Sequence, residues 1–158
     1  MKDDRIIATL NGLIEASKDA ETGFAVAARD THEPELIRVF SGGEKASRAA
    51  AAELQDQVRL LGGTAAEDGT LKAGARRTWT SVRAKVNARD DGTILEECER
   101  DESYVRERYA EALTLDLPEA IRFLVERHHG AIVDSHYRVL DLRNRFRDRG
   151  ARDLRASD

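Results

Sequence analysis

The sequence predicts an all-α protein of one domain, built from four long amphipathic helices. Apolar residues recur at intervals of three and four along four separate segments, which is the spacing of one helix face. The 158 residues include only two prolines, and aromatic residues make up 5% of the chain, which argues against a β-sandwich. Charged residues make up 35%, a fraction typical of helices whose outer faces carry ion pairs.

The first helix is expected from about Asp3 or Asp4 to about Arg29. The acidic pair at its start suits the positive end of a helix dipole. Continuing the apolar stripe by steps of three and four places Glu21 on the inward face as well. That face carries Ile6, Leu10, Leu13, Ile14, Phe24 and Ala28.

The second helix is expected from Pro34 to about Leu61. Proline suits a first helical turn, and the glycine pair at 62–63 suits a helix end. A second glycine pair, at 42–43, is unusual within a helix and predicts either a kink or a close approach by a neighbouring helix. The inward face carries Leu36, Phe40, Glu44, Ser47, Ala51, Leu54, Val58 and Leu61.

Residues 62–92 form a connection of roughly 30 residues, far longer than a turn between neighbouring helices requires. Within it, the segment from Leu71 to about Asn87 is expected to form a shorter helix. Trp79, the single tryptophan, is expected to cover one end or one side of the bundle. A connection of this length can travel the whole length of a bundle.

The third helix is expected to begin near Thr93, because Thr93 and Glu96 have the spacing of a capping box. The fourth is expected from Pro118 to about Arg147, with residues 148–158 forming a disordered tail outside a bundle of residues 1–147. The third inward face carries Leu95, Cys98, Glu102, Val105, Tyr109 and Ala112, and the fourth carries Ile121, Val125, His128 or His129, Ile132, His136 and Val139.

The lengths of the connections predict how the helices are arranged. Short links join the first helix to the second and the third to the fourth, so each pair is expected to form an antiparallel hairpin. The long connection between the hairpins lets the third helix run parallel to the second. Two hairpins joined by one long crossover are the ferritin-like arrangement of a four-helix bundle.

The bulk composition argues against several classes of function. The formal net charge is −4, and aspartates interrupt the C-terminal arginines, so no nucleic-acid partner is expected. No apolar run is long enough for a transmembrane helix, and the first residues lack the apolar core of a secretory signal. The single cysteine, Cys98, is expected to be a core residue. These features predict a cytoplasmic protein without a membrane partner.

Each expected helix carries one ionisable residue on its inward face: Glu21, Glu44, Glu102 and His136. Helix bundles build metal centres from carboxylate and imidazole groups that project inward from facing helices. Carboxylate and imidazole ligands suit Fe, Mn or Zn. The four residues are therefore candidate ligands of one metal ion, and His129, two turns before His136, is a fifth candidate or a residue at the groove edge.

A second interpretation of the same residues needs no metal. A charged group in a bundle core is costly unless it is ion-paired, hydrogen-bonded or metal-bound. The three glutamates would then pair with Arg or Lys, or accept hydrogen bonds from Ser17, Ser47 or Tyr109. Buried carboxylates of this kind have raised pKa values.

Three stretches resemble the helix signatures of a known family: LIEASKDAETGF at 13–24, AAELQDQVRLLGG at 51–63 and ILEECERDE at 94–102. Over about residues 4–146 the chain resembles uncharacterised bacterial four-helix-bundle proteins, a domain of unknown function within the ferritin-like superfamily. The resemblance implies the fold, but the family has no settled activity to carry over.

The di-iron pattern of that superfamily is incomplete in this chain. Such centres use a Glu on the first and third helices and a Glu-x-x-His motif on the second and fourth. Glu21 and Glu102 match the single glutamates, but Ser47 stands where the second helix needs His. Val133 stands where the fourth helix needs Glu. One ligand is therefore missing from each half of the pattern.

These observations predict a non-enzymatic or vestigial ferritin-like bundle that binds one metal ion in a degenerate carboxylate–histidine site. A stress-associated role follows only by analogy with the superfamily. One alternative is a ferritin-like di-metal oxidase or peroxidase with altered ligands. Another is a structural module that forms a homodimer through an outer helix face.

Overall fold

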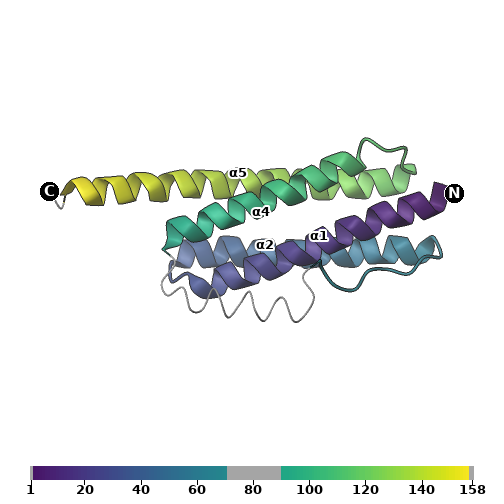
Figure 1. Cartoon of the computed structure of the whole chain (residues 1–158), viewed down its shortest axis with the longest axis horizontal. Helices are drawn as coiled ribbons and strands as arrows, with labels where there is room; N and C mark the ends of the chain where they lie inside the picture. The colour runs from purple at the N-terminus through teal and green to yellow at the C-terminus, as the bar shows by residue number, and fades with distance from the viewer. Residues whose placement is uncertain (1, 71–89, 157–158) are drawn as a thin grey trace.

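The computed structural model describes residues 2–70 and 90–156, and in these ranges it contains helices and no strand. The helices are α1 (Lys2–Asp30), α2 (Pro34–Leu60), α4 (Asp91–Ala112) and α5 (Glu119–Ala156). Figure 1 shows them packed side by side along one long axis. The predictions of an all-α fold and of four long helices are therefore confirmed.

The helices pair as two hairpins. α1 packs along α2, α4 packs along α5, and α1 against α4 joins the two pairs. α2 and α5 make far fewer contacts with each other than the other neighbouring pairs do. In Figure 1, α2 and α4 run from left to right, whereas α1 and α5 run from right to left. The gap between α2 and α5 is the most loosely packed side of the molecule.

The structure corrects the predicted start of the third helix. α4 begins at Asp91, and Asp90 is its N-cap, with its side chain accepting a hydrogen bond of 2.7 Å from the backbone N–H of Thr93. That hydrogen bond also lowers the pKa of Asp90. Thr93 therefore occupies the third helical position, where its N–H is the donor that a cap satisfies. The glycine end of α2 is as predicted, because Gly62 has a φ of 81°.

The structure also corrects the predicted end of the fourth helix. α5 continues to Ala156, beyond Arg147, and Figure 1 shows it extending past the other helices at this end. Residues 147–156 are all exposed, so burial does not hold this segment. Arginine, alanine and leucine are good helix formers, and each residue added to an existing helix gains one hydrogen bond. The helix therefore continues without an apolar stripe.

The short helix expected at 71–87, with Trp79, lies outside the described residues. Within the described ranges, no helix is long and apolar enough to cross a membrane.

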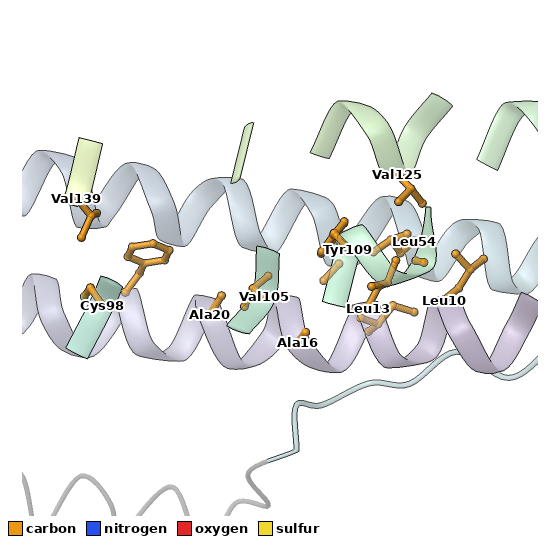
Figure 2. Close-up of a cluster of buried hydrophobic side chains, with 14 of the residues drawn as sticks. Leu10, Leu13, Ala16, Ala20, Leu54, Cys98, Val105, Tyr109, Val125 and Val139 are labelled. Carbon is orange, nitrogen blue, oxygen red and sulfur yellow. The ribbon is translucent and has the colours of Figure 1, made fainter. Parts of the chain in front are cut away.

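The hydrophobic core runs along the axis between the helices. Figure 2 shows side chains from every helix pointing into it, including Leu13 of α1, Leu54 of α2, Tyr109 of α4 and Val125 of α5. Each of these four side chains is at most 2% exposed. The core continues toward the other end of the bundle through Cys98 and Val139, so Cys98 is the core residue that the sequence predicts.

Gly43 lets α2 approach the ring of Phe24 on α1. A Cβ atom at position 43 would lie 2.8 Å from three atoms of that ring, which is too close for an ordinary contact. Phe24 cannot move freely, because it is 6% exposed and packs against Phe40 with the ring centroids 6.4 Å apart. At Gly42 there is room for a side chain, because a Cβ atom there would meet nothing within 4 Å.

We therefore predict opposite effects for the two glycines. Gly43→Ala should lower the free energy of unfolding by about 1–2 kcal/mol, because overpacking outweighs the gain in helix propensity. Gly42→Ala should raise it by up to about 1 kcal/mol, because only the propensity changes. Urea denaturation of both variants tests this. Equal effects of the same sign would contradict the close approach at Gly43.

Candidate functional site

Two of the four predicted metal ligands, Glu21 and Glu44, contact the same arginine. Arg48 lies one turn after Glu44 on α2, and its Nη2 is 2.8 Å from Glu44 Oε1. Its Nε donates a hydrogen bond of 3.0 Å to Glu21 Oε1 on α1. Lys18 adds a second cation, 3.6 Å from Glu21 Oε2. The carboxylates of Glu21 and Glu44 are thus neutralised by the guanidinium group of Arg48 and the ammonium group of Lys18.

His136 belongs to a different network, between α4 and α5. Its Nε2 is 3.1 Å from Glu99 Oε1, and its Nδ1 is 3.3 Å from Nη1 of Arg106. A guanidinium group can only donate, so Nδ1 accepts and the proton of the neutral ring is on Nε2, which donates to Glu99. Arg143 lies 3.5 Å from the other oxygen of Glu99. Both ring nitrogens of His136 are therefore engaged.

Of the carboxylates in the part of the chain that the structure describes, Glu102 alone is buried in the core, at 4% exposure. Burial raises its pKa to about 7, against the opposing effects of a hydrogen bond from Ser135 and the positive charge of Arg138. Asp101 and Glu99 raise the pKa further. Among the described residues, none lies within hydrogen-bond distance of Glu102 Oε1. This oxygen is a buried acceptor with unused capacity.

The residues present do not fit the expected metal centre. Within residues 2–70 and 90–156, no three His, Cys, Asp or Glu side chains are grouped as metal ligands would be. The four candidates are divided among an arginine bridge, a histidine–glutamate pair and a lone carboxyl group. A metal at His136 would also need a ring lone pair, but Nδ1 uses its lone pair to accept from Arg106. Glu21 and Glu44 instead follow the metal-free interpretation of the sequence, in which the inward carboxylates form ion pairs with Arg or Lys.

Of the adjacent histidines, His128 faces the bundle interior. Its Nε2 is 2.8 Å from Glu53 Oε2 of α2, and its side chain is 13% exposed. Arg127 contacts the same oxygen. The hydrogen bond with His128, with a smaller contribution from Arg127, lowers the pKa of Glu53. His129 does not contribute to this pair or to the central cavity. These contacts link α2 to α5, as does the ion pair of 2.9 Å between Arg145 and Glu35.

A cavity of about 60 Å³ lies at the centre of the bundle and opens between α2 and α5. All four helices contribute to it, and most of its lining is apolar or small. The lining residues are Ser17, Ala20, Phe24, Gly43, Ala46, Ser47, Ala50, Glu102, Val105, His128, Ala131, Ile132 and Ser135. Glu102 is the only acidic residue in this set.

The hydroxyl groups of Ser17 and Tyr109 satisfy each other beside the cavity. Ser17 Oγ and Tyr109 Oη are 2.7 Å apart, and both residues are at most 2% exposed. Burial raises the pKa of Tyr109 to about 12. The sequence suggested both residues as partners of the glutamates. In the structure they pair with each other across α1 and α4.

The chain matches one family of known protein domains. Residues 5–115, well over half of the chain, match the domain of unknown function DUF2383. The chain belongs to the DUF2383 family. No curated protein matches it. The DUF2383 match covers α1, α2 and α4 but ends before α5, so His128, Ser135 and His136 lie outside the matched region.

Sequence reasoning missed the partners that decide the state of the candidate ligands. Arg48 could have been found, because it follows Glu44 by four residues, the spacing of a helical ion pair. Glu99 lies three residues before Glu102, and its position toward α5 rather than the core had no signal in the sequence. Ser135 could have been found as the neighbour of His136, one step off the apolar stripe.

Glu102 predicts a pH dependence of stability. The pKa of about 7 in the folded chain lies above the reference value of 4.5, so the folded state holds this proton more tightly than the unfolded state. Its contribution is therefore fully present below about pH 4.5 and is lost as the pH rises through about 7. Glu102→Gln should remove this loss. Between pH 4.5 and pH 8, the free energy of unfolding of the variant should therefore fall by about 2–3 kcal/mol less than that of the parent.

The measurement is urea denaturation of the parent and the variant across this pH range. Glu107→Gln, which removes an exposed carboxylate from the same helix, is the matched control and should follow the parent. Parallel curves for the parent and Glu102→Gln would contradict a buried, titrating carboxyl group.

Because the hydroxyl groups of Ser17 and Tyr109 contact each other, we predict that the losses of unfolding free energy caused by changing them are not additive. Tyr109→Phe should lower the free energy of unfolding by about 1–3 kcal/mol, because it leaves the buried Ser17 hydroxyl without its partner. The double variant with Ser17→Ala should lose less than the sum of the two single variants. Additive losses in denaturation experiments would mean that the two hydroxyls are not coupled.

Proposed function

We propose that this DUF2383 protein is a non-enzymatic, ferritin-like four-helix bundle whose central polar groups are held by ion pairs and hydrogen bonds. The ferritin-like assignment is supported by the two hairpins and by the long link between α2 and α4. It is also supported by the parallel directions of these two helices (Figure 1). In this proposal the protein has no di-metal centre and carries out no redox chemistry, and any function of the bundle depends on what it binds.

The observation that carries this proposal is the position of Arg48. Its guanidinium group lies between Glu21 and Glu44, so a fixed positive charge neutralises two carboxylates that would otherwise attract a cation. The ligand missing at Ser47 is on the same helix, one residue before Arg48. A missing ligand and an added cation on one helix argue for the same change from a metal centre to an ion-paired centre.

Binding of one metal ion, as expected from the sequence, stays a prediction, and one observation favours it. Glu21 and Glu44 converge on a single positive group, so a cation that displaced Arg48 would meet two carboxylates at once. Arg48 is 56% exposed and can swing away into solvent. An oxidase or peroxidase would need a second ion and further ligands.

Metal analysis of the tag-free full chain separates these possibilities. We expect well under one equivalent of Fe, Mn or Zn per chain, unchanged by Glu44→Ala or His136→Ala. Iron-dependent consumption of oxygen or peroxide should stay at the background rate. One equivalent of metal in the parent, lost in both variants, would overturn the proposal in favour of the single-ion site. Circular dichroism confirms that each variant is folded.

Partners and cellular setting stay predictions from the sequence. They comprise a cytoplasmic location, a stress-associated role by superfamily analogy and a homodimer formed through an outer helix face. Large apolar side chains that are exposed include Tyr104, Phe123 and Tyr137, on the α4–α5 side of the bundle. Light scattering of the full chain measures the oligomeric state directly.

A further inference from the structure

The central cavity has the features of a binding site for a small molecule. Its mouth lies between α2 and α5, where the exposed Ala46 and Ala131 have side chains too small to cover it. Its wall includes the apolar side chains of Phe24, Val105 and Ile132. A volume of about 60 Å³ corresponds to about two water molecules of liquid volume, so a ligand with a short alkyl body would fit with part of that body in the open mouth.

One polar group gives this apolar cavity its chemical preference. Glu102 is 4% exposed, lines the cavity and has one oxygen without a hydrogen-bond partner among the described residues. Its other interactions are a hydrogen bond from Ser135 and a longer-range attraction to Arg138. The cavity residues on α1 and α2 are uncharged, and His128 is engaged by Glu53. Oε1 itself is covered by protein atoms, so a donor in the cavity reaches it only when the carboxyl group turns toward the cavity. The cavity therefore has, in a mostly apolar wall, one carboxyl group with an unused acceptor.

We propose that this cavity binds a small primary amine, with its ammonium group donating to Glu102 and its alkyl body against Phe24, Val105 and Ile132. An ammonium group supplies both the missing donor and the opposite charge for a buried carboxylate. This site goes beyond the proposed function, and it does not depend on the absence of metal from Glu21 and Glu44.

Other classes of ligand fit the cavity less well. An anion would meet Glu102 in the cavity and the nearby charges of Asp101 and Glu99, which act on the same carboxyl group. A purely apolar molecule would leave Glu102 Oε1 without a donor and would bring no charge to the carboxylate. A metal ion would find one carboxylate where at least three ligands are needed. An alcohol of the same shape could donate one hydrogen bond but would bring no charge.

The test is a titration of the isotope-labelled full chain with isobutylamine, followed by NMR chemical shifts. It is run at about pH 8, where the amine carries its proton. A ligand of about five non-hydrogen atoms should bind with a dissociation constant of about 0.1–10 mM. Saturable shifts are expected at Ser47, Val105 and Ser135. Isobutanol, the neutral molecule of the same shape, should bind at least about tenfold more weakly.

Two variants and one control locate the site. Glu102→Gln keeps the shape of the side chain but removes its charge, and it should weaken amine binding by at least about tenfold. Ala46→Leu should abolish binding by filling the mouth, whereas Ala52→Leu, at an exposed position of the same helix outside the cavity, should leave it unchanged.

Three results would overturn the proposal: no saturable shift in the parent, equal binding of isobutylamine and isobutanol, or binding unchanged in both Glu102→Gln and Ala46→Leu. The first would leave a cavity filled by water only. None of these results changes the metal analysis, which tests the proposed function separately.

Discussion

The central constraint on this structure is that each ionisable group facing the bundle interior must be neutralised within it. A metal centre would meet that constraint with one ion and several helices. Here three local solutions replace it: an arginine between Glu21 and Glu44, a histidine–glutamate pair at His136, and a raised pKa at Glu102. The first solution lies between α1 and α2, and the other two lie between α4 and α5, where Glu99 pairs with His136 and also raises the pKa of Glu102. The candidate ligands are therefore held apart in separate contacts.

The second constraint is the size of the side chains between the helices. Gly43 brings α2 close to Phe24 on α1, which tightens one hairpin. Ala46 and Ala50, one and two turns further along the same face of α2, line the cavity with side chains too small to fill it. Polar links across the gap between α2 and α5 are made by Glu53 with Arg127 and His128, and by Glu35 with Arg145. Close packing of α2 against α1 at Gly43 and small side chains further along the same face leave a cavity at the centre.

The sequence was informative about the helices because a 3.6-residue period repeats over many turns, as at Leu10 to Phe24 and Leu36 to Val58. It was less informative at helix ends, where one side chain decides the boundary: Asp90 caps α4, and α5 continues without any stripe. It placed Glu21, Glu44, Glu102 and His136 near the correct faces. It could not tell which partner each would meet, because Glu99, Arg106 and Ser135 reach their contacts through packing between helices.

The family match and the cavity do not coincide, and this limits what the family can explain. The match ends at residue 115, whereas His128, Ala131, Ile132 and Ser135 of α5 complete the cavity. Ser135 also donates to Glu102, so the state of that carboxyl group depends on a helix outside the matched region. Function resides in sites rather than in folds. The chemistry of this cavity therefore depends on α4 and α5 together. The family match extends only over α1, α2 and α4.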